Sequence, residues 1–281
     1  MTPYRGRHHA MATVFEITIA QEDIDGVYAA QAAAALFDEI DRLEQELSRF
    51  RPGSDIWRMN HLGEGGTTHL GMAAYDCLQL AKAVHEETAG AFDITIGPLM
   101  CIYRNGDDSP RIPHHEEVDF ARARVGMDVF AVDEDGLATV KVDHPTLDLG
   151  AVGKGYALDQ CVSLLQDYGI TNALLNAGES SVLALGNSPG EEGWTVTVGN
   201  AEKVPLVLKD RAVSASGFGV KGAHIMNPRT KRPAPIKKKR IWATAPTAAL
   251  SDALSTAFTV MTRAEIDAFC QRHPEVQAIL D

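Results

Sequence analysis

The sequence predicts an α+β fold with mixed or antiparallel sheets and flanking helices. The chain has 281 residues, enough to bury a substantial hydrophobic core. Its hydrophobic share of 45% and charged share of 23% are those of ordinary globular proteins. Helical and strand-like segments follow one another irregularly, which argues against the regular strand–helix alternation of a doubly wound parallel sheet.

The N-terminal half contains two strongly periodic segments. Phe15, Ile17 and Ile19 alternate with polar residues, which predicts a strand over residues 12–20 with one buried face. From Asp25 onward, apolar residues recur at steps of three and four, which predicts a long amphipathic helix that ends before the Pro52-Gly53 turn. The same criteria predict a second helix over residues 72–88 and a hairpin over residues 130–142.

The C-terminal half starts with a predicted strand, turn and helix. The strand covers residues 146–149, three glycines form the turn, and the helix covers residues 156–168. A helix over residues 250–261 and a Thr262/Glu265 capping box are predicted near the C-terminus. Between them, short apolar segments separated by turn residues predict a meandering sheet with strands in 172–178, 181–186, 193–199, 204–208, 211–216 and 241–246.

The net charge is strongly negative and limits the classes of partner. Lys and Arg number 26 against 38 Asp and Glu, which gives −12. An acidic surface repels phosphate backbones and anionic lipids, so nucleic-acid and membrane-surface roles are disfavoured. A phosphate ligand would need a metal ion, backbone amides or a helix N-terminus to offset this charge.

The cysteines and the N-terminus bear on thiol chemistry and cellular location. The four cysteines are far apart and form no Cys-x-x-Cys motif, so buried free thiols are favoured over a zinc site or disulfides. No run of about 18 apolar residues predicts a transmembrane segment. No signal peptide is recognisable, so we expect a cytoplasmic protein; the alternative is an exported or membrane-anchored one from which an N-terminal signal has been removed.

Residues 147–159 are the most informative segment for chemistry. Gly150, Gly153 and Gly155 allow a sharp turn and close approach to a ligand, and Lys154 adds a positive charge beside a helix start. The order matches neither a Walker loop nor a GxGxxG dinucleotide fingerprint. Spacing alone leaves a site for a phosphate-bearing ligand and a tight structural turn about equally favoured.

A second candidate site lies in the helix predicted over residues 250–261. Asp252 and Thr256 are four residues apart, so their oxygens share one helical face. A carboxylate and a hydroxyl so placed could hold Mg2+, which prefers oxygen ligands and keeps several waters. The simpler interpretation, which spacing alone favours, is an acid that stabilises the helix dipole beside an exposed threonine.

Two further residues have both a structural and a functional interpretation. His224 lies between a glycine-containing turn and an Asn-Pro turn, where a lone histidine is more often structural. Asp93 lies beside apolar residues, and its default role is a turn acid bonded to its own backbone. No GxSxG motif or cysteine-nucleophile motif supports a hydrolase.

Taken in order, these segments resemble the ApbE family of FAD:protein FMN transferases. The matching segments run from about residue 10 to residue 258: AMATVFEITI, LSRFRPGSDIWRMN, GAFDITIGPL, LDLGAVGKGYALD, NALLNAG, AVSASG, HIMNP and SDALSTAF. The resemblance implies one catalytic domain over residues 1–281, related to T-folds, with two lobes, a ligand cleft between them and no separate linker.

The resemblance also implies a reaction. A threonine hydroxyl of an acceptor flavoprotein attacks the FMN phosphorus of FAD, AMP leaves, and FMN stays attached as a phosphoester. The expected cofactor is Mg2+, with Mn2+ as an alternative, and FAD is the substrate. A metal and backbone amides would offset the charge of the pyrophosphate.

The resemblance assigns roles to individual residues. Asp252, Thr256 and the carbonyl of Ala151 correspond to metal ligands, and Asp252 and His224 are linked to catalysis. Residues implied in binding FAD are Met11 against the flavin, the loop residues Gly150, Gly153, Lys154 and Gly155, and Ser48, Asp93, Asp159 and Gly178 in motifs that line the cleft.

Four positions depart from the family pattern: Ala12, Glu179, Ala215 and Asn227 replace two glycines, a threonine and an aspartate. These changes bear on the catalytic rate or the choice of acceptor more than on FAD binding. Two alternatives therefore stand beside the transferase: a protein that binds FAD without transfer, and an FAD pyrophosphatase that yields FMN and AMP.

Overall fold

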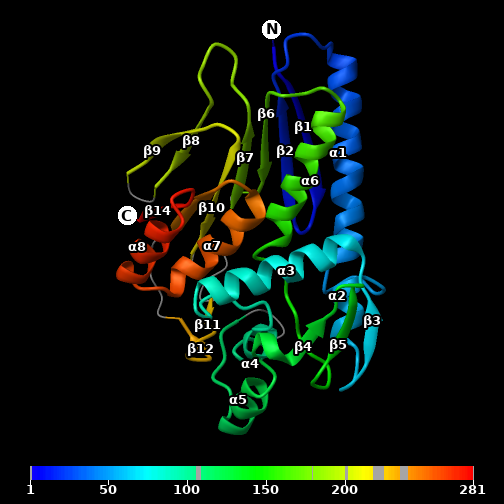
Figure 1. Cartoon of the computed structure of the whole chain (residues 1–281), viewed down its shortest axis with the longest axis vertical. Coiled ribbons are helices and arrows are strands. Elements are labelled where there is room, and N and C mark those ends of the chain that lie inside the picture. Colours follow the sequence, from blue (N-terminus) through cyan, green and yellow to red (C-terminus); the bar gives the residue numbers. More distant parts are fainter. Residues whose placement is uncertain are drawn as a thin grey trace. The chain divides into compact units, whose positions relative to one another are not determined.

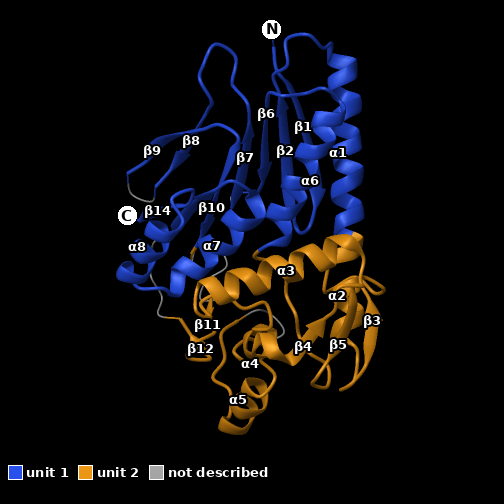
Figure 2. Cartoon of the chain, in the orientation of Figure 1, with its two compact units in different colours: residues 1–44, 152–216, 239–281 blue, residues 45–151, 217–238 orange. Residues whose placement is uncertain are grey.

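The structure is a computed structural model that describes residues 2–105, 109–178, 180–199, 202–217, 225–234 and 240–280. The chain divides into two compact units (Figures 1 and 2). Unit 1 comprises residues 1–44, 152–216 and 239–281, and unit 2 comprises residues 45–151 and 217–238. Each unit therefore combines segments that are distant in the sequence.

Unit 1 is built on a seven-stranded sheet in the order β1-β2-β6-β7-β10-β13-β14, in which every neighbouring pair is antiparallel. The predicted α+β class with antiparallel sheets is confirmed. The strands are β1 (Tyr4–Ala10), β2 (Thr13–Ile19), β6 (Ala173–Ala177), β7 (Ser181–Leu185), β10 (Arg211–Ser216), β13 (Ile241–Ala245) and β14 (Gln277–Leu280).

The helices of unit 1 pack on this sheet. Helix α6 contacts β6 and β7, and α7 contacts β7, β10, β13 and α6. Phe15, Ile17 and Ile19 of β2 are almost completely buried, as their alternation predicted. The helices are α1 (Gly26–Leu47), which extends past Glu44 into unit 2, α6 (Gly153–Asp167), α7 (Ala248–Val260) and α8 (Arg263–Arg272).

Alternate residues of the central strands face opposite sides of the sheet and pack against two different layers. Val213 and Trp242 pack with Trp194 and Leu208 of the hairpin β8 (Trp194–Val198) and β9 (Val204–Leu208). Ser216, on the other face of β10, meets a side chain of α7. The hairpin is a separate two-stranded sheet, so the predicted meander is interrupted between β7 and β10.

Unit 2 is smaller and less regular. Its three-stranded sheet has the order β3-β5-β4, and a core of Leu99, Ala121, Val125 and Met226 joins its loops and helices. The elements are α2 (Asp55–Asn60), β3 (Thr67–His69), α3 (Met72–Glu87), α4 (Gly97–Ile102), α5 (His115–Arg122), the 3-10 helix Met127–Val129, β4 (Phe130–Val132), β5 (Leu137–Val140), β11 (Met226–Asn227) and β12 (Arg232–Pro233).

Three predicted elements need correction. Strand β1 was not predicted, and within it His8 Nε2 lies 2.7 Å from Asp41 Oδ1. Residues 146–149 form no strand, although the Asp148 amide donates a hydrogen bond to the Ile94 carbonyl. Helix α6 begins at Gly153, so two of the three predicted turn glycines lie in its first turn.

Other predicted elements are confirmed closely. The predicted helices over residues 72–88 and 250–261 correspond to α3 and α7, and the hairpin over 130–142 contains β4 and β5. The Thr262/Glu265 capping box is present at the start of α8. None of the helices in the described ranges combines the length and the apolar character that crossing a bilayer requires.

Candidate functional site

The turn between β1 and β2 carries Met11, the predicted flavin contact. Ala10 pairs with Thr13, which leaves a two-residue loop of Met11 and Ala12 with φ of 49° and 56°. Two positive φ values define a type I′ turn, in which glycine is preferred. Ala12 therefore occupies a backbone conformation that an alanine adopts only at some energetic cost.

Gly178, at the end of β6, lies against the same hairpin. Its amide donates to the carbonyl of Val14 at 2.8 Å, and its φ is +64°. A Cβ at this position would lie 2.2 Å from Thr13 Oγ1. The glycine is required both by the backbone conformation and by the close contact, while Glu179 beside it lies outside the described residues.

The first turn of α6 approaches the N-terminus of α7 very closely. A Cβ on Gly155 would lie 2.2 Å from the carbonyl oxygen of Ala248 and 2.6 Å from the amide nitrogen of Ala249. Only a glycine permits this backbone-to-backbone contact. Gly155 thus has a packing role, and its neighbour Lys154 is brought to α7 by the same contact.

Asp159 connects the two helices from one turn further along α6. Its two carboxylate oxygens accept hydrogen bonds from the amides of Ala248 and Ala249, at 2.7 and 2.9 Å. These amides belong to the first turn of α7 and have no partner within that helix. Asp159 therefore stabilises the N-terminus of α7, a structural role that the sequence analysis did not predict.

Burial, together with the negative charge of Asp252, raises the pKa of Asp159 to about 6, against the two amide hydrogen bonds that lower it. The region between α6 and α7 is thus one in which negative charge is poorly solvated. The two neighbouring carboxyl groups, Asp159 and Asp252, would favour a positive charge there.

Asp252 lies on α7 with its side chain toward Lys154. Asp252 is only 3% exposed, and its Oδ2 lies 3.4 Å from Lys154 Nζ. The helix-dipole interpretation is incomplete, because Asp252 is the fifth residue of α7 and is buried. The predicted loop residue and the predicted metal ligand are therefore neighbours, although they are distant in the sequence.

Thr256 follows one helical turn after Asp252. Its hydroxyl contacts the Asp252 carbonyl at 3.3 Å and lies 2.9 Å from Ser216 Oγ of β10. Ser216 was not among the predicted site residues. Its place in the Ala-Ser-Gly segment, one of the segments that carried the resemblance, was the available signal.

These oxygens suit a hard divalent cation. Asp252 supplies a buried carboxylate, Thr256 a hydroxyl on the same helical face, and the Lys154 ammonium already marks a position where positive charge is favoured. Across the described ranges, no group of three or more His, Cys, Asp and Glu residues is placed to hold a metal. A site with one carboxylate would fit Mg2+, which keeps several water ligands.

In unit 2, two predicted site residues make local hydrogen bonds. The Ser48 hydroxyl accepts from the amide of Phe50 at 3.2 Å. Asp93 Oδ1 accepts from both the amide and the hydroxyl of Thr95, at 2.7 and 2.6 Å, which is the turn role that its sequence context favoured. Burial raises the pKa of Asp93, against the bonds from Thr95.

Gly150 and Ala151 are the last residues of unit 2 before α6 begins. The Gly150 amide donates to Asp148 Oδ1 at 2.8 Å, and Gly150 is exposed. The backbone of Leu147 is held on both sides by the Asn60 side chain, which accepts at 2.8 Å and donates at 3.0 Å. The segment that carries the predicted carbonyl ligand is thus fixed by side chains from elsewhere in unit 2.

The structure therefore brings together Lys154, Asp159, Asp252 and Thr256 within unit 1. Met11 and Gly178 lie at the β1–β2 turn of the same unit, and His224 lies outside the described residues. The predicted site residues in unit 2 are Ser48, Asp93, Gly150 and Ala151.

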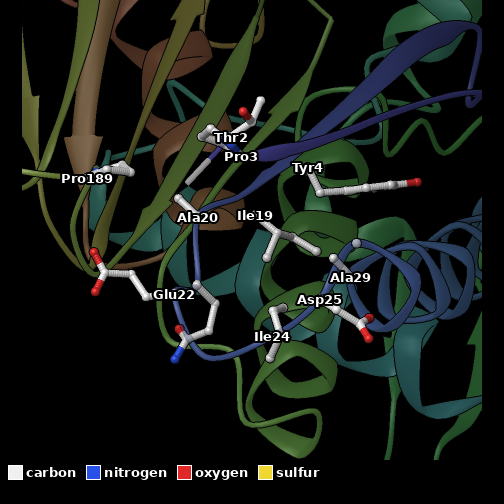
Figure 3. A pocket seen from close by; sticks show the side chains of 12 residues that line it. Thr2, Pro3, Tyr4, Ile19, Ala20, Glu22, Ile24, Asp25, Ala29 and Pro189 are labelled. Carbon is white, nitrogen blue, oxygen red and sulfur yellow. The ribbon is translucent and has the colours of Figure 1, made fainter.

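Two hollows lie elsewhere in unit 1. One, of about 60 Å³, is lined by residues that include Tyr4, Ile19 and Ile24 (Figure 3). The other, of about 510 Å³, adjoins it at Ala20 and Pro189. Neither lining includes a predicted site residue, so these hollows are distinct from the Lys154–Asp252 region.

Comparisons with known proteins bear on the whole chain. The model of the ApbE family matches residues 11–280. The chain is 27% identical over 270 residues to the FAD:protein FMN transferase of Salmonella typhimurium, covering 89% of this chain and 76% of that protein. It is 28% identical over 285 residues to the protein of the same name from Treponema pallidum, covering 89% and 78%.

Solved structures show the same fold. The flavin transferase ApbE of Vibrio cholerae matches with a TM-score of 0.86 and 19% identity, covering 98% of this chain and 92% of that chain. The ApbE protein of Thermotoga maritima matches with a TM-score of 0.84 and 25% identity, covering 99% and 93%.

Proposed function

Because the chain belongs to the ApbE family, we propose that it transfers FMN from FAD to a threonine of an acceptor flavoprotein, with AMP as the leaving group. The relatives named FAD:protein FMN transferase support flavin transfer to a protein. The metal, the threonine and the AMP product are the finer parts of the proposal. The observation that supports the metal part is the cluster of Lys154, Asp252 and Thr256 between α6 and α7, and the threonine and the AMP product rest on the resemblance.

In the proposed reaction, the threonine oxygen forms a bond to the FMN phosphorus while the anhydride bond to AMP breaks. Asp252 and Thr256 would hold Mg2+ or Mn2+, and the Ala151 carbonyl stays a prediction of the resemblance. A bound divalent ion would neutralise negative charge on the pyrophosphate as the anhydride opens. No residue of this chain acts as a covalent nucleophile, because the attacking hydroxyl belongs to the acceptor.

The chain's own residues have three tasks in this proposal. Lys154 contributes a positive charge beside the metal ligands and would counter part of the pyrophosphate charge. Ser216, 2.9 Å from Thr256 Oγ1, orients the threonine hydroxyl on α7. Asp159 fixes the start of α7 and so the positions of Asp252 and Thr256.

The test is incubation with FAD and Mg2+, with and without a flavoprotein domain that carries a candidate threonine. Transfer predicts protein-bound flavin fluorescence and AMP only when the acceptor is present. AMP release without an acceptor would support the FAD pyrophosphatase instead. Bound FAD with neither product would support the binding-only alternative.

Two threonines of α7 provide a matched pair of variants. Thr256→Val removes the proposed ligand hydroxyl with little change in volume and should abolish most of the Mg2+-dependent transfer. Thr259→Val is the control, because Thr259 Oγ1 donates to the Thr256 carbonyl and is no proposed ligand. Equal losses in both variants would show that the effect comes from helix packing.

A further inference from the structure

The carboxylate that the proposed cation needs is paired with the Lys154 ammonium. Lys154 Nζ lies 3.4 Å from Asp252 Oδ2, and the two side chains are 20% and 4% exposed. Solvent and salt screen the interactions of buried charges only weakly. A cation that approaches Asp252 would therefore interact strongly with the ammonium as well as with the carboxylate.

The second acid of this region, Asp159, is committed to the backbone of α7. Its two oxygens accept hydrogen bonds from the amides of Ala248 and Ala249, at 2.7 and 2.9 Å. Among the residues that the structure describes, no three His, Cys, Asp and Glu side chains are grouped so that they could hold a metal. A cation on this face of α7 would thus take its negative charge from Asp252, the group that Lys154 contacts.

The Thr256 hydroxyl can bind a cation without leaving its present partners. A hydroxyl has one proton to donate and two lone pairs that accept. Thr256 Oγ1 lies 3.3 Å from the Asp252 carbonyl oxygen and 2.9 Å from Ser216 Oγ. Whichever of these oxygens takes its proton, at least one lone pair remains for a cation. Of these contacts, the one that must open is that between Lys154 and Asp252.

Lys154 is placed so that its ammonium can move while its backbone stays fixed. It is the second residue of α6, which packs against α7 (Figure 1), and Gly155 beside it makes the closest approach to the backbone of Ala248. Lysine carries its charge on a flexible four-carbon stem. Two positive charges on one carboxylate repel each other, so a bound divalent ion would drive the ammonium away from Asp252.

We propose that Lys154 and a divalent cation compete for the Asp252 carboxylate, so that the cation displaces the ammonium and makes it available to the pyrophosphate of FAD. This inference rests on the proposed function, because it concerns the cation and the substrate of the proposed transfer. Loss of the Lys154 charge should then strengthen cation binding and weaken FAD binding. A lysine that only supported the folded ligand set would, when removed, weaken both.

The experiment titrates the full-length protein with Mn2+, which takes the same oxygen ligands as Mg2+, and follows free Mn2+ by electron paramagnetic resonance without FAD or acceptor. Lys154→Met, which keeps most of the side chain and removes its charge, should bind Mn2+ about tenfold more tightly than the wild type. Lys154→Arg, which keeps the charge, should bind Mn2+ no more tightly than the wild type.

Lys209→Met is the control for net charge. Lys209 is exposed and lines the larger hollow, which contains no proposed metal ligand, so its loss changes the charge of the protein by the same amount at a distinct place. This variant should bind Mn2+ as the wild type does. Equal tightening in Lys209→Met and Lys154→Met would overturn the competition, because the effect would then come from net charge.

Two further measurements test the displacement. In a crystal structure of the wild type grown with Mn2+, the anomalous signal should lie at Asp252, and Lys154 Nζ should lie beyond salt-bridge distance of both carboxylate oxygens. With Mn2+ saturating, Lys154→Met should bind FAD about tenfold more weakly than the wild type, measured by quenching of flavin fluorescence. Mn2+ on Asp252 with the Lys154 contact retained, or an unchanged FAD affinity, would overturn the displacement.

Circular dichroism on each sample confirms that folded proteins are compared. If Lys154→Met does not fold, Lys154→Gln and the wild-type crystal structure keep the test in place. Unchanged or weaker Mn2+ binding by the folded neutral variant would overturn the inference, while wild-type Mn2+ binding and transfer would still support the proposed function. A wild type that binds no Mn2+ would overturn the cation part of the proposed function as well.

Discussion

Replacing Gly155 by alanine perturbs the closest approach between α6 and α7. The new Cβ would lie 2.2 Å from the Ala248 carbonyl oxygen, whereas ordinary contact begins at 3.4 Å. Because the opposing atoms belong to the backbone, no side-chain rotation can relieve the clash. The two helices must therefore separate locally by the difference between these distances, about 1.2 Å.

That displacement also breaks the hydrogen bonds of Asp159. The bonds to the amides of Ala248 and Ala249 are 2.7 and 2.9 Å long, so a movement of this size takes both beyond hydrogen-bond distance. Hydrogen bonds to charged groups contribute about 1.5–3 kcal/mol each. After about 1 kcal/mol is regained from the better helix propensity of alanine, we expect a net loss of about 2–5 kcal/mol.

The assay is urea denaturation followed by circular dichroism, together with Mg2+-dependent flavin transfer by the folded fraction. Gly26→Ala is the control, because Gly26 begins α1 and no heavy atom lies within 4 Å of the position that the new methyl group would take. It should leave stability unchanged or raise it by up to about 1 kcal/mol. A Gly155→Ala protein within about 1 kcal/mol of the wild type, with full activity, would refute the close contact and the role assigned to it.

Three further outcomes are expected. Ala12→Gly should raise the free energy of unfolding by about 0.5–1 kcal/mol, because φ at this position is positive. As a control, Ala34→Gly in α1 should lower the free energy of unfolding by about 1 kcal/mol. A lower free energy of unfolding in Ala12→Gly would contradict the turn conformation. Burial raises the pKa of Asp159 to about 6, above its ordinary value of 3.8, so this carboxyl's contribution to stability is fully present below pH 3.8 and is lost as the pH rises through about 6. In metal-free protein, the stability of the wild type relative to Asp159→Asn should therefore fall between pH 4 and pH 7, and a rise would contradict this sign. Burial raises the pKa of the Cys161 thiol, so iodoacetamide at pH 8 should label the exposed Cys101 and spare Cys161 until the protein unfolds; equal labelling in the native state would be inconsistent with the core.

Local periodicity predicted much of the fold. The alternation at Phe15, Ile17 and Ile19 and the helical spacing of α1, α3 and α7 depend on neighbouring residues, so they can be read from one sequence. Strand β1 was missed because two of its half-buried positions hold Gly6 and His8, which are not apolar, so the sequence shows no hydrophobic alternation there. Its place in the sheet depends on pairing with β2, which is a tertiary contact.

In the candidate site, too, local spacing predicted some features, whereas tertiary contacts could not be predicted. The spacing of Asp252 and Thr256 placed both on one face of α7, but the neighbouring Lys154 comes from α6 and could not be derived from spacing. The close contact of Gly155 with the backbone of α7 could not be derived from the sequence, and its expected approach to a ligand stays a prediction. Asp159 was assigned to the cleft by resemblance; its bonds to α7 depend on a helix start almost ninety positions later in the chain.

In the proposed function, the Asp252 region supports transfer of FMN to an acceptor protein. Mass spectrometry of a threonine-bearing acceptor, after incubation with the enzyme, FAD and Mg2+, measures this directly. Transfer predicts a mass gain of one FMN less one water, one AMP released per modified acceptor, and neither product with Asp252→Asn. An unmodified acceptor, or full modification by Asp252→Asn, would contradict it.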